Sequence, residues 1–515
     1  MWLWWTGITV SLLLLAVIVY DLVQRKHAIL RNFPVVGHFR YLLEMIGPEL
    51  RQYIVTGNDE ERPFSRDQRR WVYASAKKEN NYFGFGSDNE MEQTENYLII
   101  DHSPFPLRSP TPADSDYDPN YRIPCAKILG GHRQRTKAFR PISVVNTSAM
   151  SYGSLSSVAV EAINRGCALA GCLQNTGEGS ISPHHLHGGD LIWQIGTGYF
   201  GCRDNDGGFS LSRLKEMVDR HPTVRAIEIK LSQGAKAGVG GIVPAEKVSK
   251  EISEIRGVPI GQACISPPGH TAFDGPDSLL DFVEEIAEAT GLPVGIKSAV
   301  GQMTFWLELA QLIASNDRAV DFVTIDGGEG GSGAAPLVFA DHVALPFKLG
   351  FSRVYRAFAE QGQDKNVVFI GSAKLGFPEA AVFGFALGCD MISVAREAML
   401  AIGCIQAQRC HTGHCPTGVA TQNRWLMRGL EPTSKAARLA NYLTTFRKEL
   451  IMLSRTCGVA HPAMITNDHV EILDSRFGST TIAKLFDYDE GYGLPASDDL
   501  RAVEELMKTL PAQIR

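Results

Sequence analysis

The chain has 515 residues, of which 44% are hydrophobic and 50 are glycine, and its formal net charge is −6. This length exceeds one small domain and suits a large α/β barrel with additions, or two to three domains. Acidic and basic residues are mixed without a basic stripe or a zinc-finger spacing, which argues against nucleic acid as a partner. Seven of the ten cysteines stand singly, so the pattern indicates a reducing compartment and no disulfide framework.

The first segment is apolar, because residues 2–20 carry no charged side chain. As a helix it would be about 28 Å long, close to the thickness of the hydrocarbon core of a bilayer. Arg25, Lys26 and Arg31 follow, which by the positive-inside rule leaves the bulk of the protein in the cytoplasm. A basic n-region and a small-residue cleavage site are both missing, which disfavours a cleaved signal peptide. We predict a single-pass anchor in the cell membrane over residues 1–23, with a buried core helix or an uncleaved signal as alternatives.

Residues 24–124 are irregular and rich in polar residues, prolines and aromatics. A helical stretch is expected between Pro34 and Pro48, and a second helix from Arg66 to Lys77. Neither stretch points to a particular chemistry. We therefore predict that this region is a linker and cap that packs against the main domain.

From Pro141 onward, short apolar runs that end in glycine or small polar residues alternate with amphipathic stretches. Continuous apolar strands joined by helical crossovers indicate a parallel sheet. Seven or eight such units over roughly 280 residues favour a (β/α)8 barrel over a doubly wound sheet. No GxGxxG opens a helix after an early strand, which argues against an NAD-binding half. We predict an α/β fold with a TIM barrel over residues 125–430, followed by a helical extension over residues 431–515 in which residues 436–458 form a pair of helices.

Two loops late in this region have the composition of a phosphate site. Barrels often bind phosphate with the loops after their seventh and eighth strands. Here Gly371 and Ser372 follow one apolar run, and Ala395 and Arg396 follow the next. Backbone N–H groups and a guanidinium at that place would suit FMN or a sugar phosphate, whereas glycines that only make turns are the alternative.

Glycines and lysines mark three further strand ends. Gly328 lies in the densest glycine run, which either lets the backbone approach a flat or anionic ligand or forms a mobile lid. Lys297 is expected either to be neutralised by a bound anion or to lie beside a flavin, whose reduced ring a positive charge stabilises.

Lys230, Gln233 and Lys236 follow another predicted strand. Lysines are rarely buried without a partner, so this group points to a carboxylate or phosphate ligand. An ordinary ion pair with Glu178 or Glu228 is the alternative.

Cys404, Cys410 and Cys415 are spaced C-x5-C-x4-C. This spacing is wide for zinc, although the three thiolates could still form a Cys3His zinc site with His411 or His414. A proline directly after the third cysteine resembles the ferredoxin pattern, and three ligands fit a three-iron cluster.

Several motifs in the same order resemble the FMN-binding barrel and the [3Fe–4S] loop of glutamate synthases. The resemblance covers roughly residues 141–422 and is strongest to the stand-alone, membrane-anchored FMN-binding glutamate synthase family. The motifs are SAMSYGSLS (148–156), NTGEG (175–179), QGAKAGVGG (233–241), ISPPGH (265–270), DGGEGGSGAAP (326–336) and GCIQAQRCHTGHCPTGVATQ (403–422).

The resemblance implies that electrons enter at a [3Fe–4S] cluster and pass to FMN. The reduced flavin would then give a hydride to 2-iminoglutarate, formed from 2-oxoglutarate and ammonia, to yield L-glutamate. By the same resemblance, Cys404, Cys410 and Cys415 ligate the cluster. The residues that match the family's 2-oxoglutarate site are Glu178, Gln233, Lys236 and Arg256, and those that match its FMN site are Ala149, Met150, Ser151, Asn175, Lys297, Gly328, Gly371, Ser372, Ala395 and Arg396.

The chain departs from the family in ways that bear on its substrates. It shows neither the N-terminal glutaminase domain of the glutamate synthases nor an FAD or NADPH domain, and Ile242 stands where the family commonly has glutamine. We therefore expect free ammonia, an amine or a separate nitrogen-donor subunit to bring nitrogen, and ferredoxin or a membrane redox partner to bring electrons. Two alternatives are another FMN-dependent amine or 2-oxo/2-hydroxy acid oxidoreductase, such as an N-methylglutamate synthase-like enzyme, and a non-catalytic membrane redox relay.

Overall fold

The computed structural model describes residues 2–24, 27–55, 57 and 60–513. Arg25 and Lys26, two of the basic residues predicted to flank the apolar segment, lie outside the described residues. The chain divides into two compact units, residues 1–69 and 70–515. The predicted domain boundaries stay predictions.

The first unit holds the predicted apolar helix, α1 (Trp2–Val23), followed by α2 (Ala28–Asn32), α3 (Val36–Leu50) and a π-helical turn (Arg51–Val55). Residues 4–23 are long and apolar enough to cross a membrane, with a mean hydropathy of 2.2 and 6% of the span buried, properties that an anchor shares with a signal sequence. The α3 helix continues through Pro48, which lies in its last turn. The predicted Arg66–Lys77 helix is present as α4.

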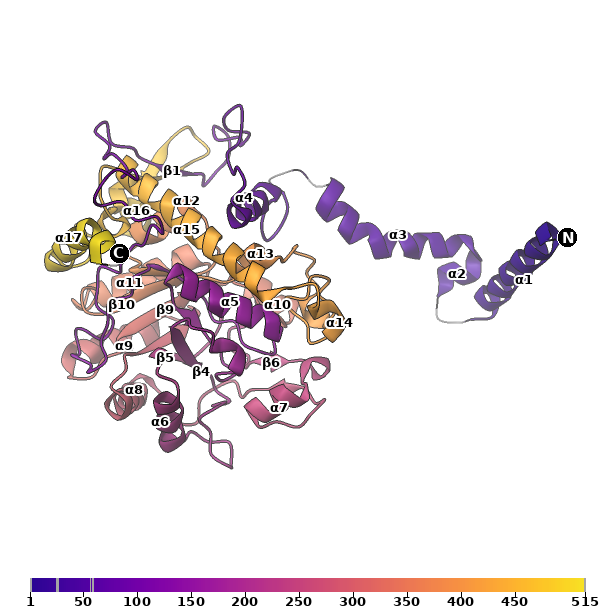
Figure 1. Ribbon diagram of the computed structural model, residues 1–515, viewed down its shortest axis with the longest axis horizontal. Helices are drawn as coiled ribbons and strands as arrows, with labels where there is room; N and C mark the ends of the chain where they lie inside the picture. Colours follow the sequence, from indigo (N-terminus) through magenta and orange to yellow (C-terminus); the bar gives the residue numbers. More distant parts are fainter. Residues whose placement is uncertain (1, 25–26, 56, 58–59, 514–515) are drawn as a thin grey trace. The chain divides into compact units, whose positions relative to one another are not determined.

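Eight parallel strands close into a barrel in the order β10-β11-β2-β3-β4-β5-β8-β9, which confirms the predicted fold class (Figure 1). Seven of the eight strands correspond to apolar runs recognised in the sequence. The eighth, β4, was not recognised, although its five residues are all buried. The strands are β2 (Val145–Thr147), β3 (Gln174–Asn175), β4 (Leu191–Ile195), β5 (Val224–Lys230), β8 (Val294–Ser298), β9 (Phe322–Asp326), β10 (Val368–Ser372) and β11 (Met391–Val394).

Helices surround the barrel, and local signals in the sequence set their ends. The α5 helix (Ser157–Ala170) begins where the Ser156 hydroxyl accepts a hydrogen bond from the Ala159 N–H, and it ends at Gly171 with a φ of +66°. Two of the amphipathic stretches that alternate with the apolar runs form α8 (Pro276–Thr290) and α9 (Thr304–Ser315). The others are α6 (Leu211–Arg220), α7 (Lys250–Arg256), α10 (Leu337–His342), α11 (Phe347–Ala359), α12 (Pro378–Ala386), α13 (Arg396–Ile402) and α14 (Arg424–Met427).

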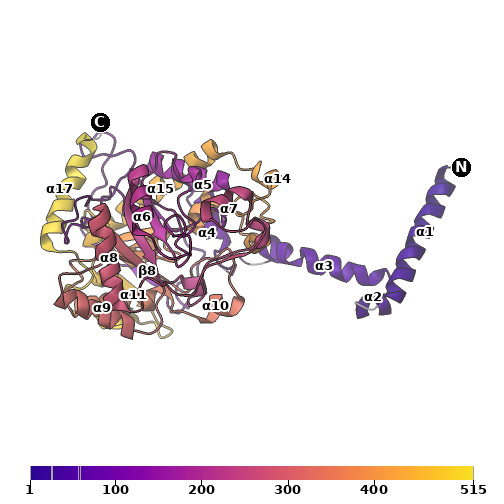
Figure 2. The same ribbon diagram turned by 90° about the horizontal axis from the view of Figure 1, so that it is seen from below.

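The predicted pair of helices at residues 436–458 is wrong, because a single 25-residue helix, α15 (Pro432–Thr456), covers this segment. After Pro432 the helix contains neither proline nor glycine, so nothing in the sequence breaks it. It packs along α5 (Figures 1 and 2). Arg447, buried in this contact, donates to the Ala170 carbonyl at 2.9 Å.

Two small sheets accompany the barrel. One joins the predicted cap to the end of the chain, because β1 (Leu98–Ile100) pairs antiparallel with β12 (Val470–Leu473), which pairs with β13 (Ser479–Thr481). The other is the hairpin of β6 (Ile242–Val243) and β7 (Cys264–Ile265). The last helices are α16 (Ile482–Phe486) and α17 (Ser497–Gln513).

Candidate active site

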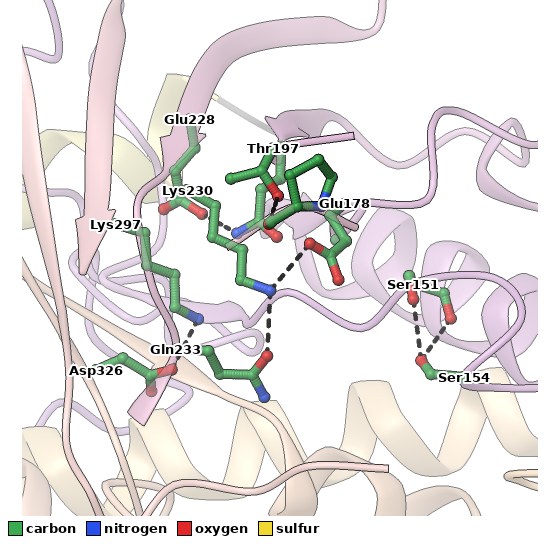
Figure 3. A network of polar contacts seen from close by, with 12 residues as sticks. Ser151, Ser154, Glu178, Thr197, Glu228, Lys230, Gln233, Lys297 and Asp326 are labelled. Carbon is green, nitrogen blue, oxygen red and sulfur yellow. Dashed lines mark hydrogen bonds and ion pairs between the residues drawn. The ribbon is translucent and has the colours of Figure 1, made fainter. Parts of the chain in front are cut away.

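Charged side chains gather where the barrel strands end. Lys230 is the last residue of β5 and is in register with Lys297 near the end of β8, and Asp326 ends β9. All three are more than nine-tenths buried. Because the carboxyl ends of parallel strands share one face of a barrel, these residues form one polar layer (Figure 3).

Lys230 lies at the centre of this layer. Its Nζ is 3.2 Å from Glu178 Oε2 and donates to Gln233 Oε1 at 3.2 Å (Figure 3). Gln233 in turn donates through Nε2 to the Gly331 carbonyl at 2.8 Å. Of the two predicted alternatives for Lys230, the ion pair with Glu178 is therefore present. The hydrogen bond of Gln233 joins the loop after β5 to the glycine run after β9.

Three cationic side chains act on the Glu178 carboxylate. Burial raises the pKa of Glu178, but the charges of Lys230, Lys236 and Arg256 together outweigh burial and hold that pKa below its ordinary value. The pKa of Lys236 falls to about 8, first because of burial and then because of repulsion from Lys230, which outweigh the attraction of Glu178. Within the described part of the chain, the Lys236 ammonium makes no hydrogen bond or ion pair.

Arg256 brings a second loop to the pocket. It is the last residue of α7, only 3% exposed, and its guanidinium donates to the Tyr152 carbonyl at 2.7 Å and contacts the Ser151 hydroxyl at 3.4 Å. The helix ends directly after it, at Gly257 with a φ of +61°. The predicted substrate residue Arg256 thus holds the predicted cofactor residue Ser151 in place.

The backbone closes tightly around the Glu178 carboxylate. A Cβ at Gly241 would lie 1.8 Å from Glu178 Oε1, and a Cβ at Gly196 would lie 2.7 Å from Oε2. Real Cβ atoms do not approach so closely, so glycine at both positions leaves the room that the carboxylate fills. The structure therefore brings together all four predicted substrate residues, the buried Lys236 and Arg256 and the half-buried Glu178 and Gln233.

A second carboxylate, Asp326, pairs with Lys297. The Lys297 Nζ lies 3.4 Å from Asp326 Oδ2, which also accepts from the Gly234 N–H at 3.1 Å. Sequence reasoning missed Asp326, although an acid that ends an apolar strand just before a glycine run could have been recognised.

The Asn175 side chain forms hydrogen bonds with a buried glutamate of the barrel and with its own loop. Its Nδ2 donates to Glu228 Oε1 at 2.7 Å, and its Oδ1 accepts from the Gly177 N–H at 3.0 Å. Glu228 accepts two further bonds, from Gln194 and Thr324, and is 1% exposed. Asn175 thus fixes the floor of the polar layer and the start of the loop that carries Glu178.

The remaining predicted FMN residues lie on neighbouring loops of the same barrel face. The Ser148 hydroxyl, just before Ala149 and Met150, is 3.2 Å from the Ser372 hydroxyl. The Ser372 carbonyl accepts from Gly327 N–H at 2.9 Å, and Arg396, directly after Ala395, donates to the Glu329 carbonyl at 2.6 Å. Hydrogen bonds thus join the loops after β2, β9, β10 and β11.

This face fits FMN by its donors. Serine hydroxyls and two cations, the buried Lys297 and the half-buried Arg396, suit a ligand that carries a phosphate and an electron-accepting ring. The two predicted FMN glycines are explained by contacts inside the protein. A Cβ at Gly371 would lie 2.7 Å from the Leu375 side chain, and one at Gly328 would lie 2.8 Å from the Ala344 carbonyl. Both glycines are therefore required by packing within the protein.

The three clustered cysteines lie in one loop after α13. Cys404 and Cys410 are partly exposed and Cys415 is buried. Burial raises the pKa of Cys410, and the neighbouring Cys415 adds to this; burial also raises the pKa of Cys415, but hydrogen bonds from nearby N–H groups and from Thr417 outweigh it and lower that pKa. Among the described residues no group of three or more His, Cys, Asp or Glu side chains is placed to hold a metal ion. The cysteines stay predicted ligands.

Comparison with known proteins gives a family. Residues 126–460 match the family model described as the conserved region in glutamate synthase. The "Glutamate synthase large subunit-like protein YerD" of Bacillus subtilis is 37% identical over 87% of this chain and 90% of its own length. The "Archaeal glutamate synthase (NADPH)" of Methanocaldococcus jannaschii is 34% identical over 66% of this chain, which spans 63% of that relative.

Among solved structures, a flavocytochrome b2 variant with sulfite bound aligns with 89% of this chain at 12% identity and a TM-score of 0.43. The family model covers more than half of the chain, and the alignment with YerD covers most of both chains. The chain therefore belongs to the family defined by the conserved region of glutamate synthases.

Proposed function

We propose that this protein is a glutamate synthase-type oxidoreductase that makes L-glutamate from 2-oxoglutarate and ammonia. The observation that carries the proposal is the excess of buried positive charge around Glu178. Lys230, Lys236 and Arg256 supply three positive charges and Glu178 supplies one negative charge, which leaves two. Buried charges require partners, so the pocket calls for a ligand with two negative charges.

A dicarboxylate satisfies this requirement better than the alternatives do. The two carboxylates of 2-oxoglutarate can pair with Lys236 and Arg256, each through charge-assisted hydrogen bonds. A 2-hydroxy acid with a single carboxylate would leave one buried cation without a partner. The charge count therefore favours the glutamate synthase reaction over a 2-hydroxy acid oxidase.

Glu178 suits the nitrogen of the reaction. Its lowered pKa keeps the carboxylate ionised at neutral pH, so it can accept a hydrogen bond from ammonium or from the protonated imine. Lys236, with a pKa of about 8, holds its proton at Nζ at neutral pH and releases it more readily than an ordinary lysine. Bound FMN would supply the hydride, and Ser151, Lys297, Ser372 and Arg396 would belong to the residues that hold it.

The other parts of the proposal concern electrons and location. Cys404, Cys410 and Cys415 would hold a [3Fe–4S] cluster, which takes electrons from ferredoxin or a membrane redox partner. The apolar α1 helix would anchor the protein in the cell membrane, with the barrel in the cytoplasm. The nitrogen would come from free ammonia, from an amine, or from a separate nitrogen-donor subunit.

The test uses the full-length protein, purified without oxygen in detergent. The flavin is reduced, 2-oxoglutarate and ammonium are added, and the flavin absorbance and glutamate are followed. Reoxidation with glutamate formed in equal amount supports the proposal. Reoxidation only with methylamine would identify an amine-specific enzyme, an unresponsive flavin would favour a redox relay, and protein without flavin or iron would refute the proposal.

A further inference from the structure

The α3 helix (Val36–Leu50) has an exposed apolar face that the proposed chemistry does not use. The side chains of this face recur every three or four residues, and the helical repeat places them within an arc about 120° wide. This apolar stripe consists of Val36, Phe39, Leu42, Leu43, Ile46 and Leu50. Each of these residues is between 36% and 74% exposed, and no charged residue of α3 falls within the arc. A contiguous exposed apolar surface marks a contact with a partner or with a membrane.

Hydrogen bonds hold the start of α3 beside the end of α1. Asp21, which is fully buried two residues before α1 ends, accepts through Oδ2 from the Val35 N–H at 2.9 Å. Its Oδ1 lies 2.9 Å from His38 Nε2. The span that is apolar enough to cross a membrane ends at Val23. The apolar stripe therefore begins at the level at which a membrane-spanning α1 leaves the hydrocarbon.

Packing of α3 against α2 and the turn before it sets the direction of α3. A Cβ at the buried Gly37 would lie 3.0 Å from the Leu30 side chain, and the His27 and Tyr41 rings meet edge to face with their centroids 5.4 Å apart. These contacts use the side of α3 opposite the apolar stripe and leave the stripe exposed. In both views α3 runs at a wide angle to α1 (Figures 1 and 2). A helix in this orientation extends along the surface of a membrane that α1 crosses.

The charges around α3 match a phospholipid surface. Residues 24–51 contain five arginine and lysine residues and two glutamates, an excess of three positive charges. Arg40, which borders the apolar stripe, is exposed and pairs with Glu44 at 2.8 Å. The cytoplasmic leaflet has a negative surface potential, which attracts basic segments beside a membrane span. An apolar face bordered by basic residues is typical of a helix that lies in the membrane interface.

We propose that α3 is an interfacial helix whose apolar stripe is inserted into the cytoplasmic leaflet of the membrane that α1 crosses. This inference rests on the anchor in the proposed function and adds a second contact between the protein and the lipid. The stripe would be buried to a depth of about 5–10 Å, at the boundary between headgroups and acyl chains. The Asp21 contacts would then join the anchor to the interfacial helix and fix the direction in which the chain leaves the membrane.

The experiment measures how close single positions lie to lipid in the full-length protein, reconstituted into vesicles of phosphatidylcholine and phosphatidylglycerol in equal amounts. A fluorescent amino acid replaces Phe39 of the stripe in one protein. In the matched control it replaces Met45, which is also apolar and 62% exposed, as Phe39 is, but lies off the stripe. In a third protein it replaces Leu13, near the middle of α1. Each protein is examined with lipids that carry a quenching nitroxide near the headgroup or near the end of an acyl chain.

We expect nitroxides near the headgroup to quench the Phe39 label about threefold more strongly than the Met45 label, and nitroxides near the chain end to quench the Leu13 label. Equal quenching of the Phe39 and Met45 labels would overturn the inference. A Phe39 label that no lipid quenches, beside a quenched Leu13 label, would also overturn it and would show that protein covers the stripe, as the predicted packing against the main domain requires. A Leu13 label that no lipid quenches would instead refute the anchor in the proposed function.

Discussion

Replacing Lys236 by methionine tests the central claim about the substrate pocket. The change removes one buried positive charge and keeps a side chain of similar length. If Lys236 pairs with a carboxylate of 2-oxoglutarate, the variant loses a charge-assisted hydrogen bond, which is worth about 1.5–3 kcal/mol. The kcat/KM for 2-oxoglutarate should therefore fall by about 10- to 150-fold.

The same substitution should stabilise the protein. The difference between the ordinary lysine pKa of 10.5 and the pKa of about 8 for Lys236 corresponds to about 3 kcal/mol, the cost of burying the ammonium without a partner. Because the pKa is lowered in the folded state, this cost applies in full below pH 8 and disappears as the pH rises to the unfolded-state value. Lys236→Met should thus raise the free energy of unfolding at pH 7 by up to about 3 kcal/mol, measured by denaturant unfolding.

The pH dependence supplies a second measure of the same charge. In the unaltered protein, the affinity for 2-oxoglutarate should fall as the pH rises through about 8, because Lys236 loses its proton there. Lys236→Arg should hold its affinity over that interval, since arginine stays protonated. A KM for 2-oxoglutarate that changes less than twofold in Lys236→Met, with activity retained, would refute the assignment of this pocket.

Three further predictions concern other parts of the molecule. Gly241→Ala should strongly reduce glutamate formation in a normally folded protein, because the added Cβ displaces the Glu178 carboxylate. The control is Gly301→Ala, because a Cβ at Gly301 meets no atom within 4 Å. Equal activities of the two variants would contradict the reasoning. Lys127→Met should lower the free energy of unfolding by about 3–5 kcal/mol, because it leaves the buried Asp390 without its ion-pair partner at 2.9 Å, and a change below 1 kcal/mol would show that the pair contributes little. Cys410→Ser should decrease the iron content and the EPR signal while flavin is retained, so an unchanged iron content would exclude Cys410 as a ligand.

The barrel could be predicted from the sequence because its strands are continuous apolar runs that end in glycine or polar residues. Seven of the eight strand regions were singled out in the sequence, and the eighth is β4. β4 was not singled out, although it too is a buried run, Leu191–Ile195, followed by Gly196. The helix pair at residues 436–458 was wrong for a different reason: a helix of 25 residues is longer than usual, although nothing after Pro432 breaks it and its packing against α5 supports it along its length.

Motifs predicted which residues meet in the pocket, but not how they pair. Lys297 and Lys230 have the same position at their strand ends, yet one pairs with Asp326 and the other with Glu178. This choice depends on the register of the closed barrel, which no local pattern reveals. Lys247 gave no signal at all, because a lysine in a short loop is usually exposed, and only the fold shows that it is buried with its Nζ donating to the Ser154 carbonyl.

The loop after β2 explains why the three parts of the proposed site depend on one another. Its first residue, Ser148, contacts Ser372 of the predicted phosphate region, and its middle holds Arg256. Its last residues bond the Lys247 side chain and Val419, which lies four residues after Cys415 in the chain. Nine residues in a loop with bonds on three sides have little freedom to move, so a displacement at one contact strains the others. In the proposed function, one segment would therefore hold the substrate cation, the cofactor region and the cysteine loop in fixed relative positions, as hydride transfer to a bound carbon requires.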